Sequence, residues 1–226
     1  MAKDSKVSIT EHNKILFLVY VNIYKMIRYR GFEPETQIYS DEASLINAIK
    51  KQDPIVISGA SHSSTSKNIK VFLVQSKDIM SKQKLPDVIT RNSNPTDDIV
   101  IVFDKKMKSS YNSAILDTER RRAIPGMENQ NKIWYMRFDN LLMEIPKHVY
   151  NTGQWKILNP SEIEEVIRLQ RLMPDDFKKV GEYDPLALWY GVVAGDLVML
   201  ETVSESAGLV RTYLYVNAQS RYVASV

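Results

Sequence analysis

The chain has 226 residues, of which 44% are hydrophobic and 25% are charged, and its formal net charge at pH 7 is +3. This composition excludes a disordered or fibrous protein, and the length suits two modest domains that each have a core. The absence of cysteine excludes disulfides, thiolate metal sites and a cysteine nucleophile.

The first predicted element is an amphipathic helix that Thr10 caps and that stops at Gly31. The residues expected to face the core are apolar and recur at helical spacing: Ile15, Val19, Ile23, Met26 and Ile27. The apolar run 15–21 follows several lysines, as in a signal peptide, but no small-residue cleavage site comes after it. A membrane span needs about 20 apolar residues. We therefore expect neither export nor membrane insertion.

An α/β pattern follows along the chain. Residues 40–51 predict a second helix with Leu45, Ile46 and Ile49 on its inner side. Three short strands are predicted at 55–58, 71–74 and 99–103, and two polar segments, 58–68 and 91–98, predict exposed loops.

The net charge changes sign near Pro146. Residues 1–142 hold 22 Lys and Arg against 16 Asp and Glu, which gives +6, whereas residues 143–226 hold 8 against 11, which gives −3. We predict two domains with these bounds. A basic first domain suits nucleic acid or another polyanion and an acidic second domain suits protein, although solvated surfaces often carry such imbalances.

The C-terminal part has the most informative pattern. Ser161 and Glu164 have the spacing of a capping box at the start of a helix. Further on, Asp184 and Pro185 predict the start of a short helix that Gly191 ends. Two apolar strands follow, on either side of the turn Ser204-Glu205-Ser206-Ala207-Gly208.

This order of residues resembles the C-terminal domain of the fifth subunit shared by eukaryotic RNA polymerases, which has a counterpart in the archaeal enzyme. The resemblance runs over residues 160–216, and residues 145–149 are similar to the segment that opens that domain. Residues 26–32 are similar to the end of the family's first helix. Where the family has basic residues this chain has Val193-Ala194, Leu209 and Leu214, so we expect a divergent member, such as one encoded by a large DNA virus.

The resemblance implies an α+β protein, with an α/β jaw of nuclease-like topology followed by a smaller α+β assembly domain in which a helix leads into a β-hairpin. It implies a noncatalytic subunit of a DNA-dependent RNA polymerase, without a cofactor, in the nucleus or, for a viral member, at a cytoplasmic replication site or in the virion. The assembly domain would dock on the largest subunit. The residues expected to carry that docking are His148, Asp184, Pro185, Trp189, Tyr190, Gly191, Gly195, Glu205, Gly208 and Tyr213.

For the two aromatic residues among these, Trp189 and Tyr190, packing in the core is an equally good interpretation.

The resemblance also places the jaw beside downstream DNA. Lys105, Lys106 and Lys108 fall at the loop expected at its tip, and lysines near phosphates attract a duplex without regard to its sequence. A solvated Lys-rich turn is the alternative. A second basic cluster, Arg120-Arg121-Arg122, fits a solvated helix end better than a nucleic-acid contact.

The rival function is that of a magnesium-dependent nuclease. Pro86-Asp87 followed by Asp104-Lys105-Lys106 resembles the Pro-Asp…Asp-x-Lys pattern of restriction-type nucleases. Asp87 and Asp104 would hold Mg²⁺, and Lys106 would stabilise the attacked phosphate. The pattern is short and permissive. The histidines, His12, His62 and His148, are too scattered for a zinc site.

Overall fold

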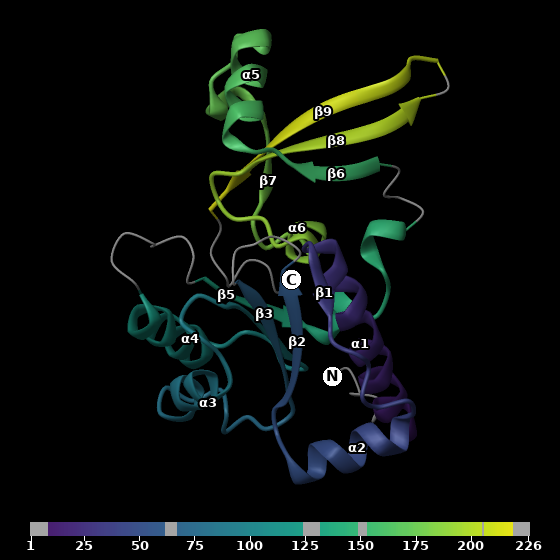
Figure 1. Ribbon diagram of the computed structural model, residues 1–226, viewed down its shortest axis with the longest axis vertical. Coiled ribbons are helices and arrows are strands. Elements are labelled where there is room, and N and C mark those ends of the chain that lie inside the picture. Colours follow the sequence, from purple (N-terminus) through teal and green to yellow (C-terminus); the bar gives the residue numbers. More distant parts are fainter. Residues whose placement is uncertain (1–8, 62–66, 124–131, 149–152, 205, 219–226) are drawn as a thin grey trace, which may run out of the picture. The chain divides into compact units, whose positions relative to one another are not determined.

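The structure is a computed structural model that describes residues 9–61, 67–123, 132–148, 153–204 and 206–218 (Figure 1). The chain divides into two compact units, Met1–Met143 and Glu144–Val226. The first unit contains a five-stranded sheet and the second a four-stranded sheet. Both units combine a sheet with helices, which confirms the predicted α+β class. Among the described residues, no helix is long and apolar enough to cross a membrane.

The sheet of the first unit has the order β1-β2-β3-β4-β5. Its strands are β1 (Phe32–Pro34), β2 (Ile55–Ser61), β3 (Asn68–Val74), β4 (Asp98–Phe103) and β5 (Ile133–Arg137). β2 is antiparallel to both β1 and β3, whereas β4 is parallel to both β3 and β5. Parallel neighbours need crossovers, and the helices α3 (Lys84–Asn92) and α4 (Ser109–Arg122) supply them.

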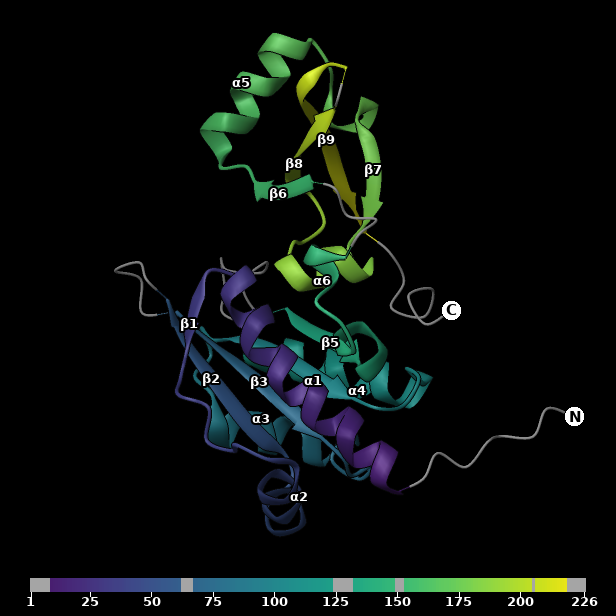
Figure 2. The same cartoon turned by 90° about the vertical axis from the view of Figure 1, so that its right-hand side faces the viewer.

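Helices cover both faces of this sheet (Figure 2). The long helix α1 (Ile9–Tyr29) lies on one face, and α3 with α4 lies on the other. Every residue of β4 is buried, as expected for a central strand covered on both sides. Gly59 of β2 permits the close approach of α1, because a Cβ there would lie 2.7 Å from Cγ2 of Ile27.

Several predicted boundaries in the first unit were wrong. Thr10 lies inside α1 rather than before it. Residues 58–61 extend β2 instead of forming a loop, and α2 (Glu42–Lys51) begins later than predicted, because Asp41 is its N-cap. Gly31 does follow the end of α1, with a φ of +80° that favours glycine. The helix α3 was not predicted, and of α4 only the end at residues 120–122 was expected.

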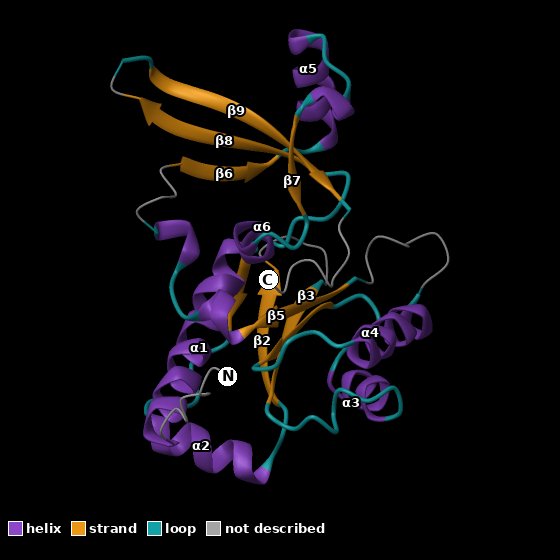
Figure 3. Cartoon of the chain, turned by 180° about the vertical axis from the view of Figure 1, so that it is seen from behind, coloured by secondary structure: helices purple, strands orange, loops and turns teal. Residues whose placement is uncertain are grey.

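The sheet of the second unit has the order β6-β8-β9-β7. Its strands are β6 (Gly153–Ile157), β7 (Lys178–Gly181), β8 (Leu197–Ser204) and β9 (Gly208–Asn217). β6, β8 and β9 are antiparallel in turn, and β7 joins β9 in parallel. α5 (Pro160–Gln170) and α6 (Pro185–Tyr190) lie on opposite sides of this sheet (Figure 3). The predicted short helix followed by a β-hairpin is confirmed.

Three short 3-10 turns complete the described structure: η2 (Phe138–Leu141), η3 (Ile145–Lys147) and η4 (Pro174–Asp176).

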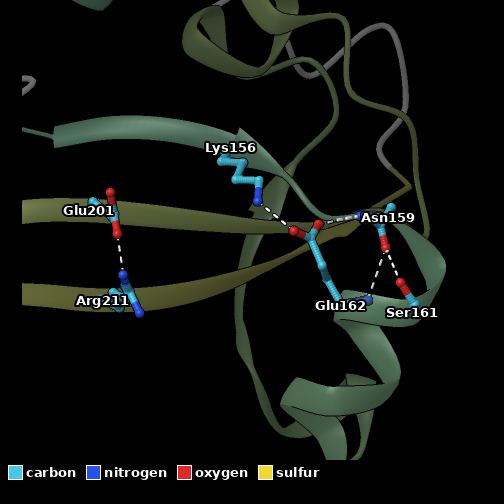
Figure 4. Close-up of polar contacts among 6 residues, drawn as sticks. All are labelled: Lys156, Asn159, Ser161, Glu162, Glu201 and Arg211. Atoms are coloured by element: carbon cyan, nitrogen blue, oxygen red, sulfur yellow. Dashed lines mark hydrogen bonds and ion pairs between the residues drawn. The ribbon is translucent and has the colours of Figure 1, made fainter.

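The capping box of α5 differs from the predicted one. It is formed by Asn159 and Glu162, not by Ser161 and Glu164. Pro160 explains the difference, because proline is favoured at the first helical position and thereby makes the preceding residue the N-cap. Figure 4 shows the side chain of Asn159 directed at the first turn of α5.

Candidate docking surface

Asp184, Pro185 and Gly191 fix the two ends of α6. The Asp184 carboxylate accepts a hydrogen bond from the backbone N–H of Leu186 at 2.9 Å, and Pro185 occupies the first helical position. Gly191 ends the helix in the left-handed region, at φ 69°, where its N–H donates to the Ala187 carbonyl at 2.9 Å. These predicted site residues therefore shape the helix.

Gly195 turns the chain from α6 into the hairpin. It has a φ of +101°, and its N–H donates to the carbonyl of Val216 at 2.8 Å. Gly208 has a φ of +69° at the start of β9, where the hairpin turn ends. Glu205, also predicted to take part in docking, lies outside the described residues.

The predicted aromatic residues lie on different sides of the sheet. Trp189 is fully buried, so its side chain offers no surface to a partner in this structure. Tyr190 is half-buried and stacks on Trp155 with ring centroids 5.7 Å apart, and burial raises the pKa of its hydroxyl. Tyr213 lies on the α5 side, where its ring and that of Phe177 pack edge to face with their centroids 6.3 Å apart.

His148 follows η3, the short turn that opens the second unit. Its backbone N–H donates to the carbonyl of Ile145 at 3.0 Å, and its side chain is partly exposed. η3 contacts α6, so His148 belongs to the α6 side of the unit. The predicted set is thus distributed over both faces and does not form one compact patch.

The three predicted DNA-contact lysines lie in the segment that joins β4 to α4. Lys105, Lys106 and Lys108 are all exposed. Lys108 is the N-cap residue of α4 but makes no side-chain capping bond, and Lys105 pairs with Asp104 at 2.9 Å. A helix N-terminus carries a partial positive charge, which adds to that of the lysines. The segment is therefore a positively charged end of the first unit.

The second basic cluster divides into exposed and buried members. Arg120 and Arg121 are exposed at the end of α4. Arg122 is buried, and its guanidinium donates to Ser93 Oγ at 2.8 Å and to the carbonyls of Asn94, Pro95 and Asp97. Arg122 therefore holds the loop before β4 and is not a solvated helix end.

The two carboxylates of the nuclease hypothesis lie on separate elements. Asp87 is exposed in the first turn of α3, and Asp104 follows β4 beside Lys105. Over the described part of the chain, no three acidic or histidine side chains gather in a group suited to a metal ion. The nuclease interpretation stays a prediction.

The second unit matches a known protein family. Residues 143–216 match the family described as RNA polymerase Rpb5, C-terminal domain. This match identifies the second unit as an Rpb5 C-terminal domain, as found in RNA polymerase subunits. The match covers α5, α6 and the four strands of the second unit, apart from the last residue of β9. A search of the curated proteins finds no match.

The Rpb5 C-terminal domain also contains a groove that the sequence did not reveal. Its volume is about 540 Å³, and it lies on the α6 side of the sheet. Residues from η3, from α6 and its cap, and from all four strands line it, including the predicted residues Asp184 and Pro185. No local motif predicts such a site, because its parts come together only through strand pairing.

The far end of the hairpin in this Rpb5 domain exposes apolar side chains. Val203 and Leu209 are cross-strand partners, and they are 79% and 58% exposed. Next to them Glu201 and Arg211 form an ion pair at 2.7 Å (Figure 4). Large exposed apolar side chains on a sheet are common at protein interfaces.

Proposed function

We propose that this chain is a noncatalytic RNA polymerase subunit that docks on the largest polymerase subunit through its C-terminal unit. The match to the Rpb5 C-terminal domain carries the proposal. The groove beside α6 and the exposed pair Val203 and Leu209 support it, because both are surfaces that a partner would cover. The docking residues act mainly by setting the shape of α6 and of the hairpin.

We also propose that the first unit lies beside downstream DNA. Support comes from the exposed lysines Lys105, Lys106 and Lys108 at the N-terminus of α4. Lysines that approach phosphates release counterions, which gives a salt-sensitive attraction independent of sequence. On this proposal the subunit acts wherever its polymerase does, in the nucleus or at a viral replication site.

Affinity purification tests the docking role. The chain is tagged at one end and expressed in its native host, and the complexes that elute are identified by mass spectrometry. We expect the two largest polymerase subunits to co-elute in near-equal amounts. Elution of the chain alone, or with proteins unrelated to transcription, would refute the docking role.

The nuclease remains the second candidate on its sequence pattern alone. Magnesium-dependent cleavage of plasmid DNA by the purified chain, lost in Asp104→Ala, would favour it over the polymerase role. We expect no cleavage, because Asp104 pairs with Lys105 and Asp87 is exposed on α3.

A further inference from the structure

The groove on the α6 side of the second sheet has an apolar floor. Leu200, Thr212 and Leu214 lie on the same face, since Leu200 pairs with Thr212 and strands alternate their side chains. Trp155 continues this floor on β6, opposite Leu200. The groove's volume of about 540 Å³ falls within the range of roughly 300–1,000 Å³ typical of binding sites. The groove has room for several side chains of a partner.

One rim of the groove is positively charged. Lys178 of β7 stands in register with Leu214 of the floor, and its side chain is exposed. Within the described residues Lys178 has no ion-pair partner. Asp184, whose carboxylate caps α6, also lines the groove. The Lys178 ammonium group therefore lies beside an apolar floor, in a unit whose net charge is negative.

We propose that this groove binds an extended segment of another polymerase subunit, with apolar side chains against the floor and a carboxylate against Lys178. The inference rests on the proposed docking role and specifies the chemistry of the docked segment. Apolar contacts give the segment its affinity, whereas the rim charge selects an acidic partner over a basic one. Thr202 and Thr212 add hydroxyl groups to the groove that can bind backbone groups of an extended chain.

Photo-crosslinking in the assembled enzyme tests this assignment. A benzophenone amino acid replaces Thr212, or Thr202 in a second variant, in the tagged full-length chain, and the polymerase is purified through the tag. After irradiation the cross-linked peptide is sequenced. We expect both probes to capture the same stretch of a polymerase subunit, with several apolar residues and at least one Asp or Glu.

A charge reversal then tests the role of the rim. Lys178→Glu should lower the yield of the cross-link about five- to tenfold, because an attractive rim contact becomes a repulsive one. The matched control is Arg168→Glu, which reverses one exposed charge on α5, on the other side of the sheet. The control should leave the yield within about twofold of the unmodified chain.

The outcomes separate this inference from the docking role. If the unmodified chain does not purify with the polymerase, the docking role itself fails. If the chain purifies with the polymerase but neither probe captures another subunit, the groove inference alone is overturned. Capture of nucleic acid, of a second copy, of residues 219–226 of the same chain or of a peptide without a carboxylate would also overturn it. Equal losses in Lys178→Glu and Arg168→Glu would remove the role of the rim charge.

Discussion

Asn159 and Glu162 hold the start of α5 by reciprocal hydrogen bonds. The Asn159 side chain accepts from the N–H of Glu162 at 3.0 Å, and the Glu162 carboxylate accepts from the N–H of Asn159 at 2.9 Å. Lys156 of β6 pairs with the same carboxylate, as Figure 4 shows. The capping box therefore also joins the helix to an edge strand of the sheet.

Replacing Asn159 should destabilise the second unit. We expect Asn159→Ala to lower the free energy of unfolding by about 1 kcal/mol, because the first turn of α5 loses the acceptor for the N–H of Glu162. Urea denaturation followed by circular dichroism measures the change. Ser161→Ala is the control, since it leaves both backbone hydrogen bonds in place and should cost less than about 0.5 kcal/mol. Equal losses would contradict the assignment of the cap.

The same carboxylate should make stability depend on pH. Its hydrogen bonds with Lys156 and with the N–H of Asn159 lower the pKa of Glu162 below its ordinary value of 4.5. A lowered pKa means that the stabilising effect is complete above pH 4.5 and is lost as the pH falls through the pKa of the folded state. We expect a shallower decline on acidification from about pH 6 to about pH 3 in Glu162→Gln than in the unmodified chain. Glu165→Gln, on the exposed side of α5, should retain the original decline.

Arg121 and Arg122 should respond very differently to the same substitution. Arg122→Met should lower the free energy of unfolding by about 2 to 3 kcal/mol, because the carbonyls of Asn94 and Asp97 lose a charged donor in a buried place. Arg121→Met should change it by less than about 0.5 kcal/mol, since Arg121 is exposed. Thermal unfolding of both variants makes the comparison. A larger loss of stability in Arg121→Met than in Arg122→Met would contradict the structural role of Arg122.

The basic loop should govern contact with duplex DNA. Replacing Lys105, Lys106 and Lys108 with Glu should weaken binding of a DNA duplex at low salt. A plot of the logarithm of the binding constant against the logarithm of the salt concentration should also become less steep, by about one unit of slope per lysine. Fluorescence anisotropy with a labelled duplex measures both. The control places the same charge reversals on other exposed lysines of the first unit, Lys50, Lys51 and Lys77. Similar losses in both variants would indicate a general charge effect and would contradict the loop assignment.

Parts of the fold with a strong periodic pattern were predictable from the sequence. α1 repeats apolar residues at helical spacing, and the hairpin has turn residues between two apolar runs. The extent of α4 was missed because its buried side includes Thr118 and Arg122, which hide the apolar period. β7 was missed because Lys178 and Lys179 give no strand pattern, and its pairing with β9 supplies the structure.

The candidate site was less predictable than the fold. The sequence predicted Asp184 and Gly191 as the two ends of α6, because caps depend on a few adjacent residues, whereas Gly195 was singled out by the family resemblance. It did not show that Trp189 is buried or which side of the sheet Tyr213 faces. It did not show the groove at all. These features depend on strand register and on packing between distant segments.

Electron cryo-microscopy of the polymerase purified through this chain would locate both units within the enzyme. We expect α6 and the β8–β9 hairpin to contact the largest subunit, and the loop carrying Lys105, Lys106 and Lys108 to face the downstream duplex. Particles that lack the chain, or that carry it with the C-terminal unit facing solvent, would rule out the proposed docking.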